Sequence, residues 1–128
     1  DSVDVVFASN FFEHLRDKES LFRYLVEIRR VLKPRGRLLV IQPNVRLLGG
    51  SYWDFIDHHI PLTDRSMAEA LELSGLEVEE ILPRFLPYTT RSRMPQHPMF
   101  VRLYLKLPFL WSLLGKQTWF VARKEGCS

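Results

Sequence analysis

The chain has 128 residues, 46% hydrophobic and 26% charged, which suits one globular domain with a buried core. Its single cysteine, Cys127, excludes an internal disulfide framework and favours a reducing compartment, so a cytoplasmic location is expected. The net charge of +3 is unevenly distributed, because residues 83–124 carry basic side chains and no acidic ones. That basic third could face an anionic substrate, nucleic acid or an anionic membrane, or could be a solvated surface.

The first third of the chain predicts a strand, a helix and a second strand. Residues 3–9 form an almost continuous apolar run, typical of a parallel strand covered on both faces. Apolar residues at helical spacing, with Asp17 as N-cap, predict an amphipathic helix over 17–32. Residues 33–36 (KPRG) predict a type I turn, and a buried strand follows at 37–42. This order indicates a right-handed βαβ crossover, and hence an α/β protein with a parallel sheet.

Outside residues 83–114, the rest of the chain predicts one more helix and two more strands. Thr63 or Asp64 caps a helix that Gly75 closes. Apolar and acidic residues then alternate from 76 to 82, as expected of a strand near a sheet edge. A final strand is predicted over 118–122.

A proline-punctuated apolar insertion, residues 83–114, precedes the final strand. Within it, residues 99–114 are not expected to span a membrane, because Arg102, Lys106 and Pro108 interrupt them. They predict an amphipathic helix instead. Two roles remain open for this helix: packing over the sheet core, or acting as a lid or membrane-surface element for a lipid-linked substrate.

Ligands of open α/β sheets bind outside the carboxyl ends of the strands. Three segments of this chain are expected at that position: residues 9–14 (SNFFEH), residues 43–46 (PNVR), and the loop that leads to the sequence DFIDHH at 54–59.

Three stretches carry a resemblance to a known family: "DVVFASNFFEHL", "EIRRVLKPRGRLLVIQPN" and "DFIDHHIPLTDRSMAEALELSGLEVEE". Together they resemble the C-terminal half of a class I S-adenosylmethionine-dependent methyltransferase of type 11 or type 12, with a Rossmann-like fold. The resemblance implies that residues 3–9 and 37–42 are the fourth and fifth strands of a seven-stranded sheet. The strands present would pack in the order four, five, seven, six, with the last antiparallel, as one partial domain over 1–128. Arg35 departs from the family, which usually has glycine there.

The resemblance implies that the cofactor is S-adenosylmethionine and that its methionine and sulfonium end lies beside the segment after the first strand. The implied contacts are Ser9, Asn10, Phe11, Phe12 and His14, with Phe11 or Phe12 as an apolar wall; an aromatic turn that only closes the sheet end is the alternative. The family's Gly-rich cofactor loop has no counterpart here, since no G-x-G occurs. We therefore expect the chain to be a fragment that is inactive alone.

On the acceptor side, His58 and His59 are the candidate catalytic bases, because an imidazole titrates near neutral pH. Asn44, Trp53 and Asp57 are the candidate substrate contacts. A purely structural loop is the alternative. No metal site is expected, although imidazole and carboxylate suit divalent ions, because adjacent histidines tend to point apart.

The predicted function is methyl transfer to a small-molecule, glycan or lipid-linked acceptor, and the alternative is a non-enzymatic interaction module. A short-chain nicotinamide reductase is disfavoured because no Tyr-x-x-x-Lys occurs, and a nucleic-acid amino-methyltransferase because Asn-Pro-Pro-aromatic is missing. No nucleic acid partner is expected. Peripheral membrane contact through 99–114 is a further expectation. Homodimerisation through the strand at 3–9 is also expected, because in a fragment the loss of the sheet neighbour from the missing half would leave its edge unpaired.

Overall fold

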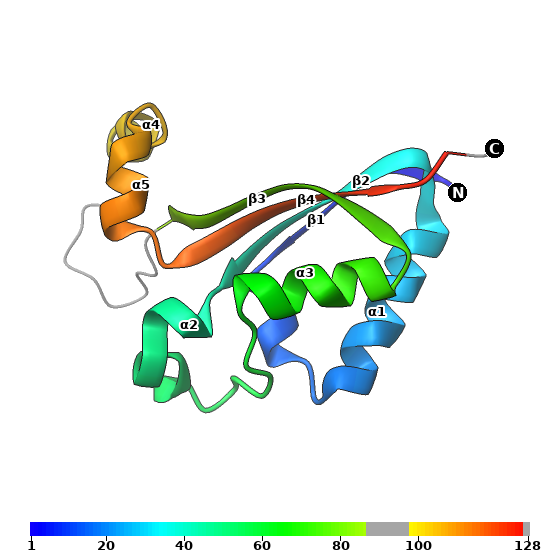
Figure 1. Cartoon of the computed structure of the whole chain (residues 1–128), viewed down its shortest axis with the longest axis horizontal. Coiled ribbons are helices and arrows are strands. Elements are labelled where there is room, and N and C mark those ends of the chain that lie inside the picture. The colour runs from blue at the N-terminus through cyan, green and yellow to red at the C-terminus, as the bar shows by residue number, and fades with distance from the viewer. Residues whose placement is uncertain (87–97, 127–128) are drawn as a thin grey trace.

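The computed structural model describes residues 1–86 and 98–126. Its secondary-structure elements follow in chain order (Figure 1): β1 (Val3–Ser9), a 3-10 helix (Phe12–His14), α1 (Lys18–Val31), β2 (Leu32–Pro43), α2 (Val45–Leu48), a 3-10 helix (Gly49–Asp54), α3 (Asp64–Leu73), β3 (Leu76–Leu86), α4 (Pro98–Leu105), α5 (Pro108–Leu114) and β4 (Gln117–Lys124).

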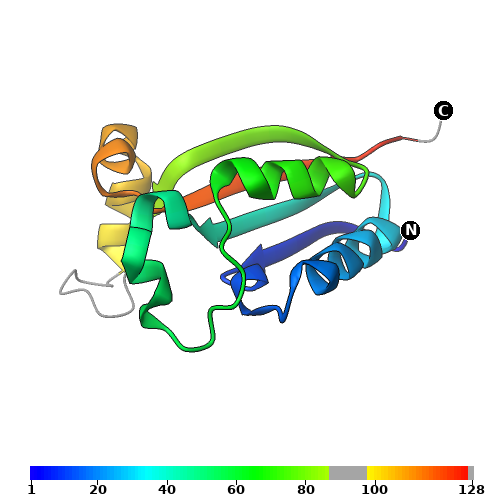
Figure 2. The same ribbon diagram turned by 60° about the horizontal axis from the view of Figure 1, so that its bottom comes forward.

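The strands form one sheet in the order β1-β2-β4-β3 (Figure 2). β1 pairs with β2 in parallel, and β4 lies antiparallel between β2 and β3. This is the predicted order of four, five, seven, six with an antiparallel last strand. The α/β prediction is therefore confirmed. The parallel pair places Ser9, the end of β1, in register with Ile41, two residues before the end of β2.

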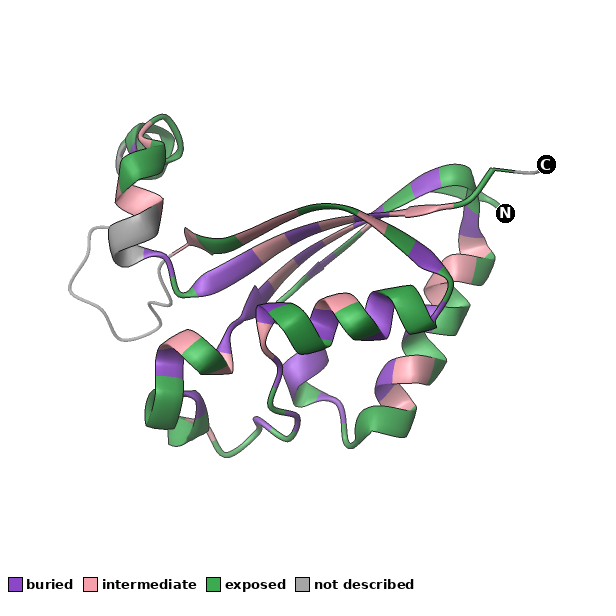
Figure 3. Ribbon diagram, in the orientation of Figure 1, coloured by how far each residue is buried: buried purple, intermediate pink, exposed green. Residues whose placement is uncertain are grey.

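The helices α1 and α3 lie on the same side of the sheet, and the core fills the space between (Figures 1 and 3). Leu38, Val40 and Phe120 point into this core and are fully buried, a burial that stabilises the fold by roughly 2 kcal/mol for each side chain. The other face of β1 is open, since Val5 and Phe7 are 55% and 59% exposed. The prediction that β1 is covered on both faces is thus wrong for the described residues, where β1 is an edge strand.

Two helices begin at side-chain caps that the sequence indicated. The carboxylate of Asp17 accepts a hydrogen bond from Ser20 N at 2.8 Å, which fixes the start of α1. α3 begins with a reciprocal capping box between Thr63 and Ser66, so Thr63 rather than Asp64 is the N-cap.

Residues 33–36, predicted as a type I turn, lie within β2 as an irregularity of the strand. Arg35 has φ +67°, a left-handed value that the third residue of a type I turn does not take. The irregularity shifts the β1–β2 register between the pairs Val3–Leu32 and Val5–Arg37. Gly36 follows because a Cβ there would lie 2.8 Å from Lys33 O. Arg35 is the residue at which this chain departs from the family, and its positive φ is a conformation that glycine adopts most easily.

The apolar segment 99–114 forms two helices instead of the single one predicted. Pro108 starts α5, since proline suits the first helical turn and cannot continue α4. The pair is attached to β3 through Tyr104, whose hydroxyl donates to Phe85 O at 2.6 Å, and through the edge-on contact of Phe85 with Trp111. Within the described residues, no helix has the length and apolar character needed to cross a membrane.

Candidate functional site

The segment after β1 turns sharply at the end of the parallel strands. Asn10 has φ +52°, and its N–H donates to Ile41 O at 2.9 Å, which ties the turn to β2. Phe11 then remains 37% exposed and packs edge-on against Tyr24, with ring centroids 5.2 Å apart. Phe12 is fully buried in the core. Of the two phenylalanines proposed as an apolar wall, only Phe11 therefore reaches the surface.

Glu13 is a buried carboxylate for which the sequence analysis proposed no role. It is 1% exposed, and its Oε2 accepts a hydrogen bond from Gln42 Nε2 at 2.9 Å. Its Oε1 lies 3.3 Å from His14 Nε2 but accepts no hydrogen bond from the described residues. Burial raises the pKa of this carboxyl. The hydrogen bond from its own backbone N–H, the neighbouring imidazoles and the hydrogen bond from Gln42 oppose that shift only in part.

The loop containing His58 folds back onto the same turn. The backbone N–H of His59 donates to Glu13 O at 2.8 Å, which brings residues 57–60 beside residues 11–14. His14 Nδ1 lies 3.0 Å from Asp57 O and 3.3 Å from Asp57 Oδ2. We call this end of the sheet, residues 9–14 together with 57–60, the rim.

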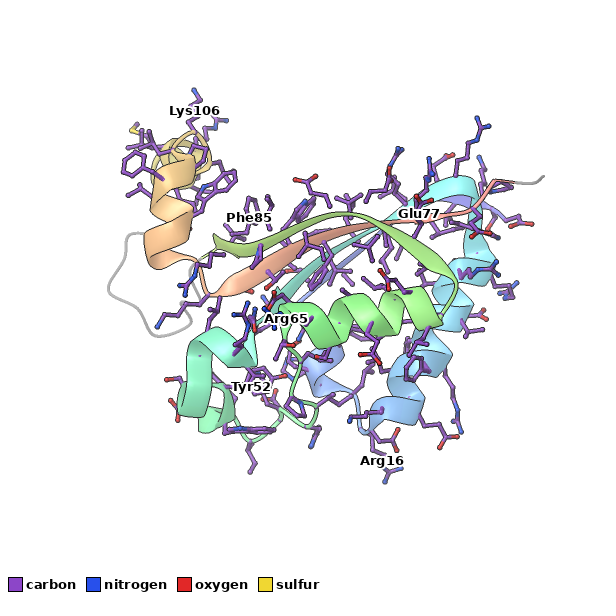
Figure 4. All side chains as sticks on the ribbon, in the orientation of Figure 1. Arg16, Tyr52, Arg65, Glu77, Phe85 and Lys106 are labelled. Atoms are coloured by element: carbon purple, nitrogen blue, oxygen red, sulfur yellow. The ribbon has the colours of Figure 1, made fainter. Side chains whose placement is uncertain are left out.

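The two neighbouring histidines point to different environments. His58 is buried, and its ring packs 4.8 Å from that of Tyr52 and 5.1 Å from that of Phe55. The Nδ1 atom of His58 lies 2.5 Å from Tyr52 O. The hydroxyl of Tyr52 (Figure 4) donates a hydrogen bond to Ile60 O. His59 is exposed, so the two neighbouring imidazoles lie in different environments. Of the pair, His59 is the one open to solvent.

The candidate substrate contacts lie in two different settings. Trp53 is 51% exposed and contacts Tyr52 edge-on, and Asp57 is exposed beside His14. Asn44 is 1% exposed and belongs to a separate buried network. Its Nδ2 donates to Asp64 Oδ1 at 2.8 Å and to Thr118 Oγ1 at 3.1 Å, so its contact with an acceptor stays a prediction.

Asp64 holds this second network together. Arg46 donates to the same Oδ1 from Nε at 3.0 Å and from Nη2 at 2.8 Å. Burial alone would raise the pKa of Asp64, but the hydrogen bonds from Asn44 and Arg46, with the charge of Arg46, lower it below the ordinary value.

Sequence reasoning placed residues 9–14, residues 43–46 and the loop to His59 at one end of the sheet. The structure brings residues 9–14 and 57–59 together, whereas Asn44 belongs to the separate Asp64 network. Sequence reasoning missed Glu13, Gln42 and Tyr52, the buried residues that hold the rim in shape. The available signal was the pair Glu13-His14 directly after an apolar strand, quoted in the resemblance but given no chemical role.

Comparison with known proteins gives one family match and several similar folds. The family model described as "Methyltransferase domain" matches residues 1–40, which hold β1, the rim turn and α1. No curated protein matches the chain.

Among solved structures, an S-adenosylmethionine-dependent methyltransferase from Methanosarcina mazei is 16% identical with a TM-score of 0.68, and the match covers 98% of this chain and 61% of that one. One from Archaeoglobus fulgidus is 20% identical with a TM-score of 0.63, covering 96% and 60%. A putative methyltransferase from Haloferax volcanii, in complex with the Trm112 methyltransferase activator, is 19% identical with a TM-score of 0.64, covering 99% and 56%.

The chain thus spans about three fifths of the length of these structures. The sequence match includes the turn that forms half of the rim, and the fold match extends over nearly the whole chain. Residues 1–40 therefore match the methyltransferase domain family, and the fold is that of an S-adenosylmethionine-dependent methyltransferase, as the resemblance implied.

Proposed function

We propose that the intact protein transfers a methyl group from S-adenosylmethionine to a small-molecule, glycan or lipid-linked acceptor. The observation that carries this proposal is the juxtaposition of the rim's two halves. The turn that follows β1 lies within the family match, and the loop Asp57–His59 is hydrogen-bonded to it through Glu13 O. A cofactor held by one half would therefore meet an acceptor held by the other.

The residues after β1 suit the sulfonium end of S-adenosylmethionine. Ser9 and Asn10 are exposed polar groups, and Phe11 presents a half-exposed ring beside them. An aromatic ring can attract a cationic sulfonium through its π face and exclude water from it. When bound, the cofactor supplies an electrophilic methyl group. The chain's own contribution is to orient the sulfonium end of the cofactor and to exclude water from it.

On the acceptor side, His59 is the better placed base. It is exposed, whereas His58 is buried against Tyr52 and Phe55. An imidazole at the rim can accept a proton from an acceptor hydroxyl as methyl transfer proceeds. Trp53, 51% exposed on the same loop, offers an aromatic surface for stacking against a sugar or another ring.

The helices α4 and α5 support a lipid-linked acceptor. Leu103 and Phe109 are 54% and 62% exposed, and Arg102 and Lys106 are exposed among them, Lys106 at the end of α4 (Figure 4). Apolar side chains interspersed with cations suit the interface of an anionic membrane. An open surface depression adjoins them, lined by Leu82, Pro83, Arg84, Pro108 and Trp111. Arg84 gives this depression a positive charge that suits an anionic headgroup.

Two further parts of the proposal concern the chain by itself. We propose that residues 1–128 alone are inactive, because no G-x-G loop is present to hold the rest of the cofactor. Homodimerisation through β1, an edge strand of the described sheet, stays a prediction.

Calorimetric titration with S-adenosylmethionine tests this function, comparing the intact gene product with the isolated residues 1–128. We expect binding by the intact product and weak or no binding by the isolated chain. Failure of the intact product to bind the cofactor would refute methyl transfer and favour the non-enzymatic interaction module. Micromolar affinity of the isolated chain would contradict its expected inactivity.

A further inference from the structure

Three side chains converge at the rim in a way that methyl transfer does not require. Glu13, His14 and His58 each offer one potential ligand atom, and these atoms lie within 4.8 Å of one another. They come from two segments that the hydrogen bond from His59 N to Glu13 O holds together. The cluster is therefore fixed by the fold and does not depend on a single flexible loop.

The carboxylate at the centre of the cluster is incompletely satisfied. Glu13 is 1% exposed, and Gln42 donates to only one of its two oxygens. The other, Oε1, accepts no hydrogen bond from the described residues, although it lies 3.3 Å from His14 Nε2. Burying a carboxylate oxygen without a donor is costly, and a bound cation would remove that cost.

Both histidines are held in the tautomer that metal-binding histidines usually have. His14 Nδ1 lies 3.0 Å from Asp57 O, and His58 Nδ1 lies 2.5 Å from Tyr52 O. A carbonyl oxygen can only accept, so each Nδ1 must carry the proton. The lone pair of the neutral ring then lies on Nε2, and a backbone carbonyl bound to the opposite nitrogen is the usual support of a ligating imidazole.

We infer that Glu13, His14 and His58 form a binding site for a divalent transition-metal ion such as Zn²⁺. Two imidazoles and one carboxylate form a known set of three protein ligands for zinc, and they leave one position for water or substrate. Imidazole favours such an ion over Mg²⁺. Tetrahedral zinc separates its ligand atoms by about 3.4 Å, so small side-chain rotations would close the cluster. The His14 side chain is 37% exposed and gives the ion access from solvent.

This site differs from the one that the sequence analysis considered and set aside. The earlier site involved the adjacent pair His58 and His59, of which His58 is buried and His59 is exposed. The structure supplies Glu13 and His14 as the remaining ligands in place of His59. The inference depends on these contacts and stands independently of the proposed methyl transfer.

Titration calorimetry with ZnCl2 on chelator-treated protein tests the site, in a Cys127→Ser background because a thiol also binds zinc. We expect one Zn²⁺ per chain. Glu13→Gln, which keeps the size of the side chain, and His14→Ala should each weaken Zn²⁺ binding at least tenfold. His59→Ala is the matched control and should leave the zinc affinity unchanged. MgCl2 should bind at least tenfold more weakly than ZnCl2.

Circular dichroism identifies any variant that fails to fold, and Glu13→Gln is the variant for which the fold is least disturbed. Three results would overturn the site: no Zn²⁺ binding by the parent protein, unchanged zinc affinity in folded Glu13→Gln, or equal losses in His59→Ala and His14→Ala. A rise in the melting temperature with ZnCl2 that Glu13→Gln abolishes would support it independently of calorimetry.

Discussion

Replacing Asp64 by alanine should destabilise the fold by about 2–3 kcal/mol, because this carboxylate is the shared acceptor of a buried network. The Asp64 side chain is 9% exposed, and its loss leaves Asn44 Nδ2 with Thr118 Oγ1 as its only remaining acceptor among the described residues. A buried donor deprived of its partner costs about 1–3 kcal/mol. Arg46 adds less than about 1 kcal/mol, because its side chain is 45% exposed and returns to water.

Urea denaturation at neutral pH measures this loss, as a fall of about 1 M in the midpoint. Because the folded-state pKa of Asp64 is lowered, its contribution is present above the unfolded-state pKa of about 4 and is lost as pH falls through the folded-state value. The difference between the parent and Asp64→Ala should therefore shrink in acid. Glu72→Ala, an exposed change on the same helix, should stay within about 0.5 kcal/mol of the parent.

Equal stabilities of Asp64→Ala and Glu72→Ala, or a loss that persists undiminished at pH 2, would refute this reasoning. The same assay examines Asn44, which was predicted as a substrate contact. Asn44→Ala should also lose about 1–3 kcal/mol, because it removes a buried donor from Asp64 and the cap of α2. An Asn44→Ala protein that keeps its stability and loses only acceptor affinity would instead support the substrate role.

The remaining predictions concern the intact protein. Phe11→Ala should weaken S-adenosylmethionine binding about tenfold in calorimetry while the melting temperature stays nearly constant; unchanged affinity would place the cofactor elsewhere. His59→Ala should lower kcat by about 10²-fold across neutral pH without changing cofactor affinity, and full turnover would exclude it as the base. His58→Ala should lower both kcat and the melting temperature, because that side chain is buried. Binding to anionic vesicles in flotation should weaken with salt and on replacement of Arg102 and Lys106 by glutamate, whereas no flotation at low salt would exclude membrane contact.

Most of the sheet could be predicted because its signals are local. The apolar runs at 3–9 and 37–42, the Asp17 cap and the Gly75 helix end each indicated an element that the structure contains. The order of the strands followed from the resemblance rather than from any local pattern. The type I turn predicted at residues 33–36 rested on Pro34 and Gly36, and only the backbone shows that Arg35 has a positive φ within β2.

The site was less predictable, because its buried members act through contacts that sequence spacing does not show. The sequence does not distinguish Phe11 from Phe12, because both are phenylalanines after the same strand. The 3-10 helix that begins at Phe12 decides which of the two side chains reaches the surface. The sequence did not indicate a role for Glu13, because its burial depends on contacts with Gln42 and with the loop that contains His59. The prediction of a single helix over 99–114 was wrong because a second helix, α5, begins at Pro108. Proline cannot continue a preceding helix, so the sequence already contained the signal for this break.

Photolabelling tests most directly the claim that the turn after β1 lies beside the reactive end of the cofactor. The intact protein would be irradiated with S-adenosylmethionine that carries a labelled methyl group, digested, and its labelled residues identified by mass spectrometry. We expect label within residues 9–14, at Phe11 above all, and loss of label when excess unlabelled cofactor competes. Competable label confined to other segments, with none in residues 9–14, would contradict it.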